Sequence, residues 1–167
     1  MGKQSVKTLL AILLLAALTV GCVFGFRVMR ADLLYFNIER ELVFWGSNER
    51  QPTAAELADA LQRIDRALQY WPDNADYLVM KARILIWHGV IAGDTQVADG
   101  HFKQALAVME RALAVRPSNP YSWALYAEYL TTQPDRGGDL TAAVAKVRLL
   151  GPGDPNLQKR MQAISPR

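Results

Sequence analysis

The chain has 167 residues, enough for one domain, and carries 19 Lys and Arg against 16 Asp and Glu. Two lysines precede the first apolar stretch, so everything after Phe26 has 17 basic and 16 acidic residues, a charge too small to hold phosphate backbones despite a pI of about 9.1. This composition excludes nucleic acid as a partner, and the lone Cys22 excludes an intrachain disulfide.

The first predicted element is a transmembrane helix over residues 8–26, after a short tail of residues 1–7. Thr8–Phe26 is 19 residues long and contains no charged side chain. An α-helix needs about 20 apolar residues to cross the hydrocarbon core. A cleaved signal peptide would have a shorter apolar core and a small-residue cleavage site. The run is instead bracketed by basic residues on both sides, namely Lys3, Lys7, Arg27 and Arg30.

The segment Leu18–Cys22 offers an alternative anchor. It resembles a bacterial lipobox, in which the cysteine is lipidated after cleavage and tethers the protein to a membrane. In that motif a leucine usually stands three places before the cysteine, where this chain has Thr19. Apolar residues also follow Cys22, where a polar tether is usual. We therefore prefer Cys22 as a small apolar residue of the membrane helix, with lipidation as the alternative.

The charges at the two ends of the apolar run suggest an orientation. A short N-terminal tail bearing Lys3 and Lys7 most often stays in the cytoplasm. The rest of the chain is then expected outside it, which for a bacterium means the periplasm. Contact with membrane lipid is expected only through residues 8–26.

Residues 27–51 follow as a membrane-proximal helix and a turn. Leu34, Ile38, Leu42 and Trp45 line up near one helical face, so we expect the helix to continue from the anchor to about Gly46. Gly46–Pro52 is then the turn. A continuous helix would hold the following residues close to the bilayer rather than on a flexible tether.

The rest of the chain contains an internal repeat. Pro72, Pro117 and Pro152 each follow a similar segment, and they are 45 and 35 residues apart. A 34-residue period with two insertions accounts for both intervals. The pattern resembles the tetratricopeptide repeat, a unit of two helices, over residues 52–156. A C-terminal helix and tail occupy residues 157–167.

The resemblance places small residues where paired helices touch. In the second helix of successive repeats these positions are Ala60 and Ala67, then Ala105 and Ala112, with Ala82 and Ala127 in the first helices. The third copy departs from the pattern, with Leu140 and Val147 where alanines are expected. The family resemblance implies a non-catalytic module that binds other proteins.

Local signals support the same helices without the family. Thr53 and Glu56 form a capping box before a helix that ends near Trp71. Asn119 and Asp154 each stand before a proline, as a helix cap does. The pair Gly137-Gly138 indicates a turn, with Asp139 capping the next helix. Strand alternation is missing, so the predicted fold class is all-α: an N-terminal transmembrane helix followed by a short repeat array.

The sequence contains no catalytic constellation, and we expect neither an enzyme nor a cofactor. His88 and His101 flank a predicted loop, Gly89–Gly100, and a helical hairpin could bring them within reach of each other. The sequence offers no further metal ligands near this pair. We therefore interpret the two histidines as ordinary polar residues at the ends of a loop and predict no metal site.

The candidate binding residues come from the repeat register. The face that lines the concave groove in this family carries Arg83 and Trp87, then Tyr121 and Glu128 in the next repeat. Tyr, Trp and Arg often dominate binding energy at protein interfaces. Packing of Trp87 against the neighbouring helix is an equal alternative. Internal packing is also expected for the remaining tryptophans, Trp71, Trp123 and Trp45.

These features predict a membrane-anchored adaptor that holds a protein partner in a bacterial envelope assembly. Size, anchor and repeat placement resemble the small VpsP-like proteins encoded with exopolysaccharide synthesis and export machinery. This similarity implies a role in polysaccharide biosynthesis or export at the inner membrane. Alternatives are an accessory subunit of cytochrome maturation or pilus assembly, and a lipoprotein tether through Cys22.

Overall fold

The computed structural model describes residues 3–47 and 50–164, and side chains from residue 7 onward. The tail before Lys3, part of the predicted turn (residues 48–49) and the last three residues lie outside this description. The elements are α1 (Lys3–Gly46), α2 (Ala54–Tyr70), α3 (Ala75–Ile91), α4 (Thr95–Val115), α5 (Pro120–Leu130), the short 3₁₀ helix η1 (Pro134–Arg136), α6 (Gly137–Leu150) and α7 (Pro155–Ile164). The fold class is all-α across the described residues.

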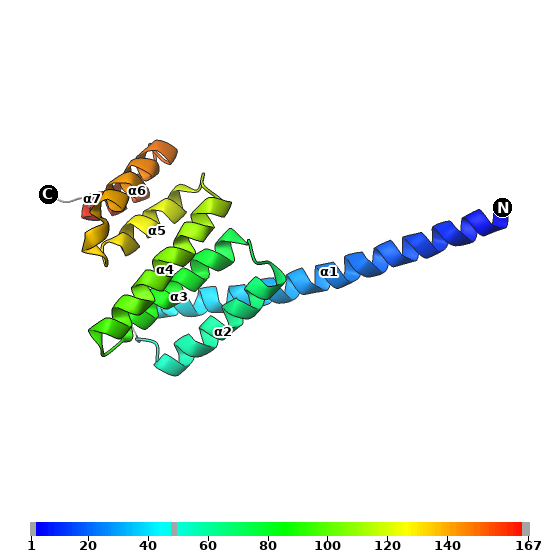
Figure 1. Cartoon of the computed structure of the whole chain (residues 1–167), viewed down its shortest axis with the longest axis horizontal. Helices are drawn as coiled ribbons and strands as arrows, with labels where there is room; N and C mark the ends of the chain where they lie inside the picture. The colour runs from blue at the N-terminus through cyan, green and yellow to red at the C-terminus, as the bar shows by residue number, and fades with distance from the viewer. Residues whose placement is uncertain (1–2, 48–49, 165–167) are drawn as a thin grey trace.

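Helix α1 is one continuous helix of 44 residues with two different halves. Its N-terminal half projects alone, away from the other helices, and its C-terminal half packs against α2 and α3 (Figure 1). In the part of the chain that the structure describes, α1 is the one helix long and apolar enough to cross a membrane. The apolar residues of the projecting half are exposed, because none of the other described helices covers them.

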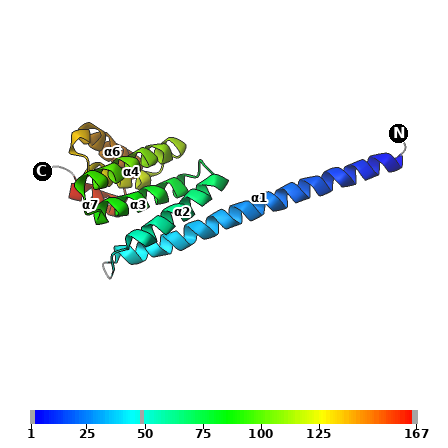
Figure 2. The same cartoon turned by 60° about the horizontal axis from the view of Figure 1, so that its bottom comes forward.

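The C-terminal half of α1 and the other helices form antiparallel hairpins, and these hairpins are stacked along one direction. The C-terminal half of α1 pairs with α2, α3 pairs with α4, and α5 pairs with α6, while α7 packs on α5 and α6 (Figures 1 and 2). The insertion in the middle repeat lengthens its helices to 17 and 21 residues instead of forming a long loop. The predicted loop Gly89–Gly100 is therefore too long, because only residues 92–94 lie between α3 and α4.

Small residues lie at the helix contacts, as the repeat register predicts. They are almost completely buried and belong to α2, α3, α4 and α5: Ala60, Ala67, Ala82, Ala105, Ala112 and Ala127. A methyl group leaves room for the backbone of the paired helix, and longer side chains such as Ile64 and Met109 fill the space between these contacts.

Side-chain caps fix most of the helix starts. The capping box is confirmed, since Thr53 accepts from the backbone N–H of Glu56 and the Glu56 carboxylate accepts from that of Thr53. Asn119 and Asp154 cap α5 and α7, with a proline at the first helical position of each helix. The predicted turn at Gly137-Gly138 is wrong. Both glycines lie in the first turn of α6, and Asp139 pairs with Arg136 instead of capping.

The core consists of two adjoining clusters. One joins the C-terminal half of α1 to α2 and α3 through Ile38, Leu42, Trp45 and Ile64. The other joins α3 to α7 around Leu106, Met109, Leu130 and Leu157. The first cluster places α1 inside the array as the opening helix of the first repeat. The helix that could span a membrane therefore continues without a break into the first repeat.

The tryptophans divide between core and surface. Trp45 is a core residue, and Trp123 is half-buried against the second cluster, with its indole N–H donating to the carbonyl of Pro117 at 2.7 Å. The prediction that Trp71 is buried is wrong, because 46% of its surface is exposed. Trp71 is the C-cap residue of α2, where the chain leaves the helix and the side chain turns away from the repeat.

Candidate protein-binding surfaces

The predicted groove residue Arg83 lies on α3 between the first helices of the neighbouring repeats. Burial raises the pKa of Tyr35 on α1 and of Tyr129 on α5, and the positive charge of Arg83 opposes both shifts. Arg83 therefore lies close to both neighbours. Within the described part of the chain it is half-buried and forms no ion pair. A guanidinium in this position is available to a carboxylate from another molecule.

Trp87 lies one turn further along α3, and its side chain packs against the core. Its ring is partly buried and packs against the cluster formed by Ile38, Trp45 and Ile64. Removing it would open a cavity in the first repeat, so a mutation at Trp87 would confuse a loss of binding with a loss of stability.

Tyr121 and Glu128 hold the C-terminal helix in place. The hydroxyl of Tyr121 donates to Asp154, the cap of α7. Glu128 forms a bidentate ion pair with Arg160 of α7, whose Nε and Nη2 lie 2.6 and 2.8 Å from the two carboxylate oxygens. The Tyr121 hydroxyl, and then the Leu157 backbone N–H, holds the pKa of Asp154 below its usual range. Helix α7 therefore occupies the part of the groove that the third repeat would otherwise present.

A second group of contacts ties α1 to α3 at the start of the groove. Tyr77 donates its hydroxyl hydrogen to Asp32, and its ring lies 5.4 Å from that of Tyr35. Burial, followed by the hydrogen bond to Asp32, raises the pKa of Tyr77. Asp76 pairs with Arg116 at the end of α4. Asp32 and Asp76 therefore already have partners, whereas Arg83 forms no ion pair among the described residues.

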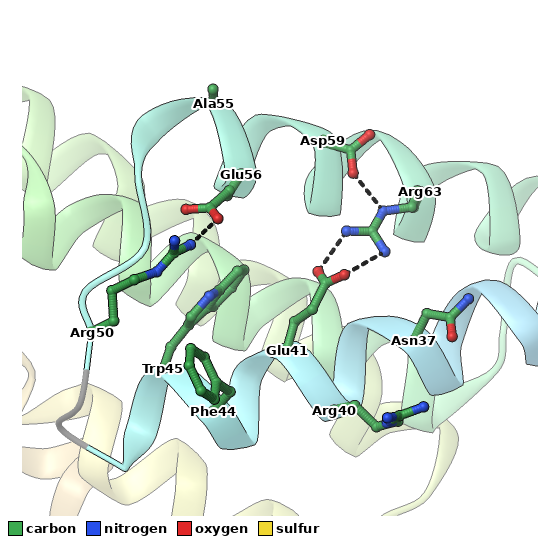
Figure 3. Close-up of a pocket in the computed structure, with 10 residues that line it drawn as sticks. All are labelled: Asn37, Arg40, Glu41, Phe44, Trp45, Arg50, Ala55, Glu56, Asp59 and Arg63. Carbon is green, nitrogen blue, oxygen red and sulfur yellow. Dashed lines mark hydrogen bonds and ion pairs between the residues drawn. The ribbon is translucent and has the colours of Figure 1, made fainter.

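Figure 3 shows a cavity of about 790 Å³ between the end of α1 and the start of α2. Arg63 bridges the two helices, with its Nη atoms 3.1 and 2.6 Å from Glu41 and its Nε 2.8 Å from Asp59. Arg50 pairs with Glu56 nearby. The three arginines and three acids of the lining balance in charge. This is the outer face of the first repeat, and repeat arrays need polar end faces to remain soluble.

His88 and His101 come together as their hairpin position suggests. Their rings stack with centroids 5.0 Å apart. Burial, followed by the charge of His101, lowers the pKa of His88. Stacked rings direct their nitrogen lone pairs side by side, not toward a common point, and the described residues contain no group of three possible metal ligands. The pair is a packing contact between α3 and α4.

Two exposed aromatic residues, Tyr70 and Trp71, stand at the end of α2, and Tyr70 lies beside α1 close to the end of its apolar run. Tyr70 lines a surface depression together with residues of α1 from Cys22 to Arg30. The end of α2 therefore overlaps the last turn of the Thr8–Phe26 segment. Tyrosine and tryptophan are the residues that concentrate where a membrane meets water. The sequence pattern missed this corner, because it treats Trp71 only as a repeat position.

The stacked hairpins, buried small residues and proline-marked turns define an all-helical repeat protein mounted on a long apolar helix. Residues 92–156 match a family model for the tetratricopeptide repeat. Among solved structures, TTC0263, a thermophilic TPR protein in Thermus thermophilus, is similar at 16% identity and a TM-score of 0.46, with 80% of each chain covered. No curated protein matches the chain.

Residues 92–156 are thus similar to tetratricopeptide repeats, and such repeats imply a protein-interaction scaffold. The matched segment begins between α3 and α4 and includes the third hairpin. The first repeat lies outside the match. Its opening helix is the end of α1, the same helix that carries the long apolar run. Proteins built from these repeats are generally scaffolds without catalytic activity.

Proposed function

We propose that the chain is a single-pass inner-membrane adaptor whose repeat groove binds a segment of a protein partner in a bacterial envelope assembly. The observation that carries this proposal is Arg83, which lies close to α1 and α5 and forms no ion pair among the described residues, while Asp76 and Glu128 are already paired. A segment with a carboxylate, lying along the groove past Tyr35 and Tyr129, would complete this site.

The anchor is the first part of this proposal. Residues 8–26 would span the bilayer, and the Tyr70-Trp71 corner would lie at the membrane surface, next to Arg27 and Arg30. Because α1 continues without a break into the first repeat, the groove would be held at a fixed height above the lipid. Such an adaptor presents its partner at a set distance from the membrane.

Topology can be tested with a reporter fused after Arg167. We expect an enzyme that is active only in the periplasm to be active in this position, because the lysine-bearing tail favours a cytoplasmic N-terminus. Cell fractionation would measure retention of the chain in the inner membrane. An active cytoplasmic reporter together with an inactive periplasmic one would place the groove in the cytoplasm.

The groove is tested by Arg83→Ala in the full chain. Loss of a true hot spot costs about 2 kcal/mol or more, which is about thirtyfold in affinity. We expect the variant to insert into the membrane and keep its helical content by circular dichroism. The partner that co-purifies with the unchanged protein should be lost.

The matched control is Arg148→Ala, which removes an exposed arginine from α6, the second helix of its repeat. It should retain the partner at the unchanged level. Trp87, Tyr121 and Glu128 are unsuitable as first tests, because the first packs in the core and the other two hold α7. Full recovery of the partner with Arg83→Ala would remove Arg83 from the binding site.

The identity of the co-purified partner tests the pathway. A component of exopolysaccharide synthesis or export would support the role suggested by size, anchor and repeat placement. A component of cytochrome maturation or pilus assembly would support the alternative. Mass spectrometry of the N-terminal region decides between the anchors, since a lipid on Cys22 would favour the lipoprotein tether.

A further inference from the structure

A surface depression lies where α1 leaves its apolar run. It has a volume of about 450 Å³ and is formed by two elements, α1 and the last residue of α2. Figure 1 shows the end of α2 beside α1, near the start of the projecting half. The depression therefore exists only because the first repeat docks on α1. Its lining consists of Cys22, Val23, Phe26, Arg27, Arg30 and Tyr70.

The lining changes from apolar to cationic along α1. The half toward the N-terminus is formed by Cys22, Val23 and Phe26, and the half toward the repeats by Arg27 and Arg30. The change falls where the uncharged run of α1 ends, and the lining extends over a helical rise of about 12 Å. A phospholipid in a bilayer presents its acyl chains and then its phosphate in the same order. The depression therefore matches one lipid molecule in polarity.

The polar groups of the depression lack partners within the described part of the chain. Arg27 and Arg30 form no ion pair there, and no described acid lines the depression. The Arg30 guanidinium lies over the ring of Phe26, 5.8 Å from its centroid, because side chains on a helix tilt toward its N-terminus. The charge is thus held next to the apolar half. Across the depression, the Tyr70 hydroxyl supplies a further donor.

We propose that this depression binds one anionic phospholipid. Its phosphate accepts hydrogen bonds from Arg27, Arg30 and the Tyr70 hydroxyl, and its acyl chain lies against Val23 and Phe26. This inference rests on the membrane anchor of the proposed function, because only a chain that spans the bilayer places the apolar half among acyl chains. A free phosphate would leave that half in water, and a peptide would have to enter the bilayer to fill it. Two arginines without acids favour an anionic lipid over a zwitterionic one, whose own cation offsets its phosphate.

Native mass spectrometry of the full chain in dodecyl maltoside tests the site, with phosphatidylglycerol as the probe. We expect one chain to retain one phosphatidylglycerol after the detergent is removed, to retain phosphatidylcholine less, and not to retain inorganic phosphate. Arg27→Gln combined with Arg30→Gln should weaken retention about thirtyfold, since each basic residue near anionic lipid contributes a factor of about five. Tyr70→Ala removes the second wall without changing the charge and should also weaken retention.

The matched control is Arg40→Gln combined with Arg148→Gln. It removes the same charge from exposed arginines of α1 and α6 and should retain the lipid as the unchanged chain does. Equal retention by the two double variants, equal retention of the two lipids, or unchanged retention by Tyr70→Ala would overturn the proposal. So would binding of inorganic phosphate at similar strength.

Cell fractionation separates a failure of the lipid site from a failure of the proposed function. A chain that is found in the membrane but retains no phosphatidylglycerol would refute the lipid site and leave the anchor intact. A chain found in the soluble fraction would refute the anchor, and the lipid site with it. Circular dichroism of each variant should show unchanged helical content, because the substituted side chains are exposed.

Discussion

Ile38→Ala is expected to destabilise the first repeat by about 2–5 kcal/mol, the largest effect predicted for a single substitution in this chain. Ile38 is fully buried and joins α1 to α2 and α3. The truncation removes three carbon atoms and leaves a cavity that the paired helices cannot close. Circular dichroism of the full chain in detergent should show a clear fall in melting temperature, and limited proteolysis should cut near α2 first.

The control for Ile38→Ala is Asn37→Ala, one residue away on the exposed side of α1. It should leave the melting temperature almost unchanged, since surface substitutions usually change stability by less than about 0.5 kcal/mol. If both variants had the same melting temperature as the unchanged protein, the end of α1 would not be part of the first repeat. A long free helix would then carry an independent repeat pair.

Ala105→Leu is expected to lower stability by about 1–3 kcal/mol through overpacking. Ala105 is fully buried in the cluster that joins α3, α4 and α5, where a larger side chain must push one helix away from its neighbours. Each repeat contacts only the next, so the loss should spread to both hairpins that meet at α4. Thermal unfolding measures the total loss, and hydrogen exchange should show it concentrated in α3, α4 and α5.

Ala107→Leu provides the matched comparison, because it makes the same change two residues along α4 at an exposed position. Leucine is almost as favourable as alanine within a helix, so this variant should keep the original stability. A higher melting temperature for Ala105→Leu than for Ala107→Leu would show that the helices can separate to admit the larger side chain. The repeat contact would then be looser than the burial of Ala105 implies.

Much of the fold could be predicted because it depends on local chemistry. Helix caps are formed by residues close in sequence, so Thr53, Asn119 and Asp154 identify helix starts directly. Small residues such as Ala105 recur at one period because each repeat meets the same neighbour. The uncharged run Thr8–Phe26 needs only length and composition to be recognised. These features require no knowledge of which distant segments meet.

The site was less predictable, because it depends on which distant side chains meet. Repeat counting places Arg83 and Glu128 on the same face, but only the packing of α7 gives Glu128 its partner Arg160 and leaves Arg83 unpaired. The same counting assigns Trp71 to the interior, whereas the end of α2 leaves it exposed, next to Tyr70, which lies against the apolar run of α1.

The helices, their order and the period of the array follow from the amino-acid sequence alone, since caps, prolines and small residues act within a few turns of their own positions. Which apolar faces remain uncovered depends instead on how the helices dock. The periodicity of α1 is compatible with burial on either side, and the docking of α2 and α3 on Ile38 and Trp45 leaves Leu33, Phe36 and Val43 exposed. Burial depends on contacts between residues far apart in the chain, which no local pattern records.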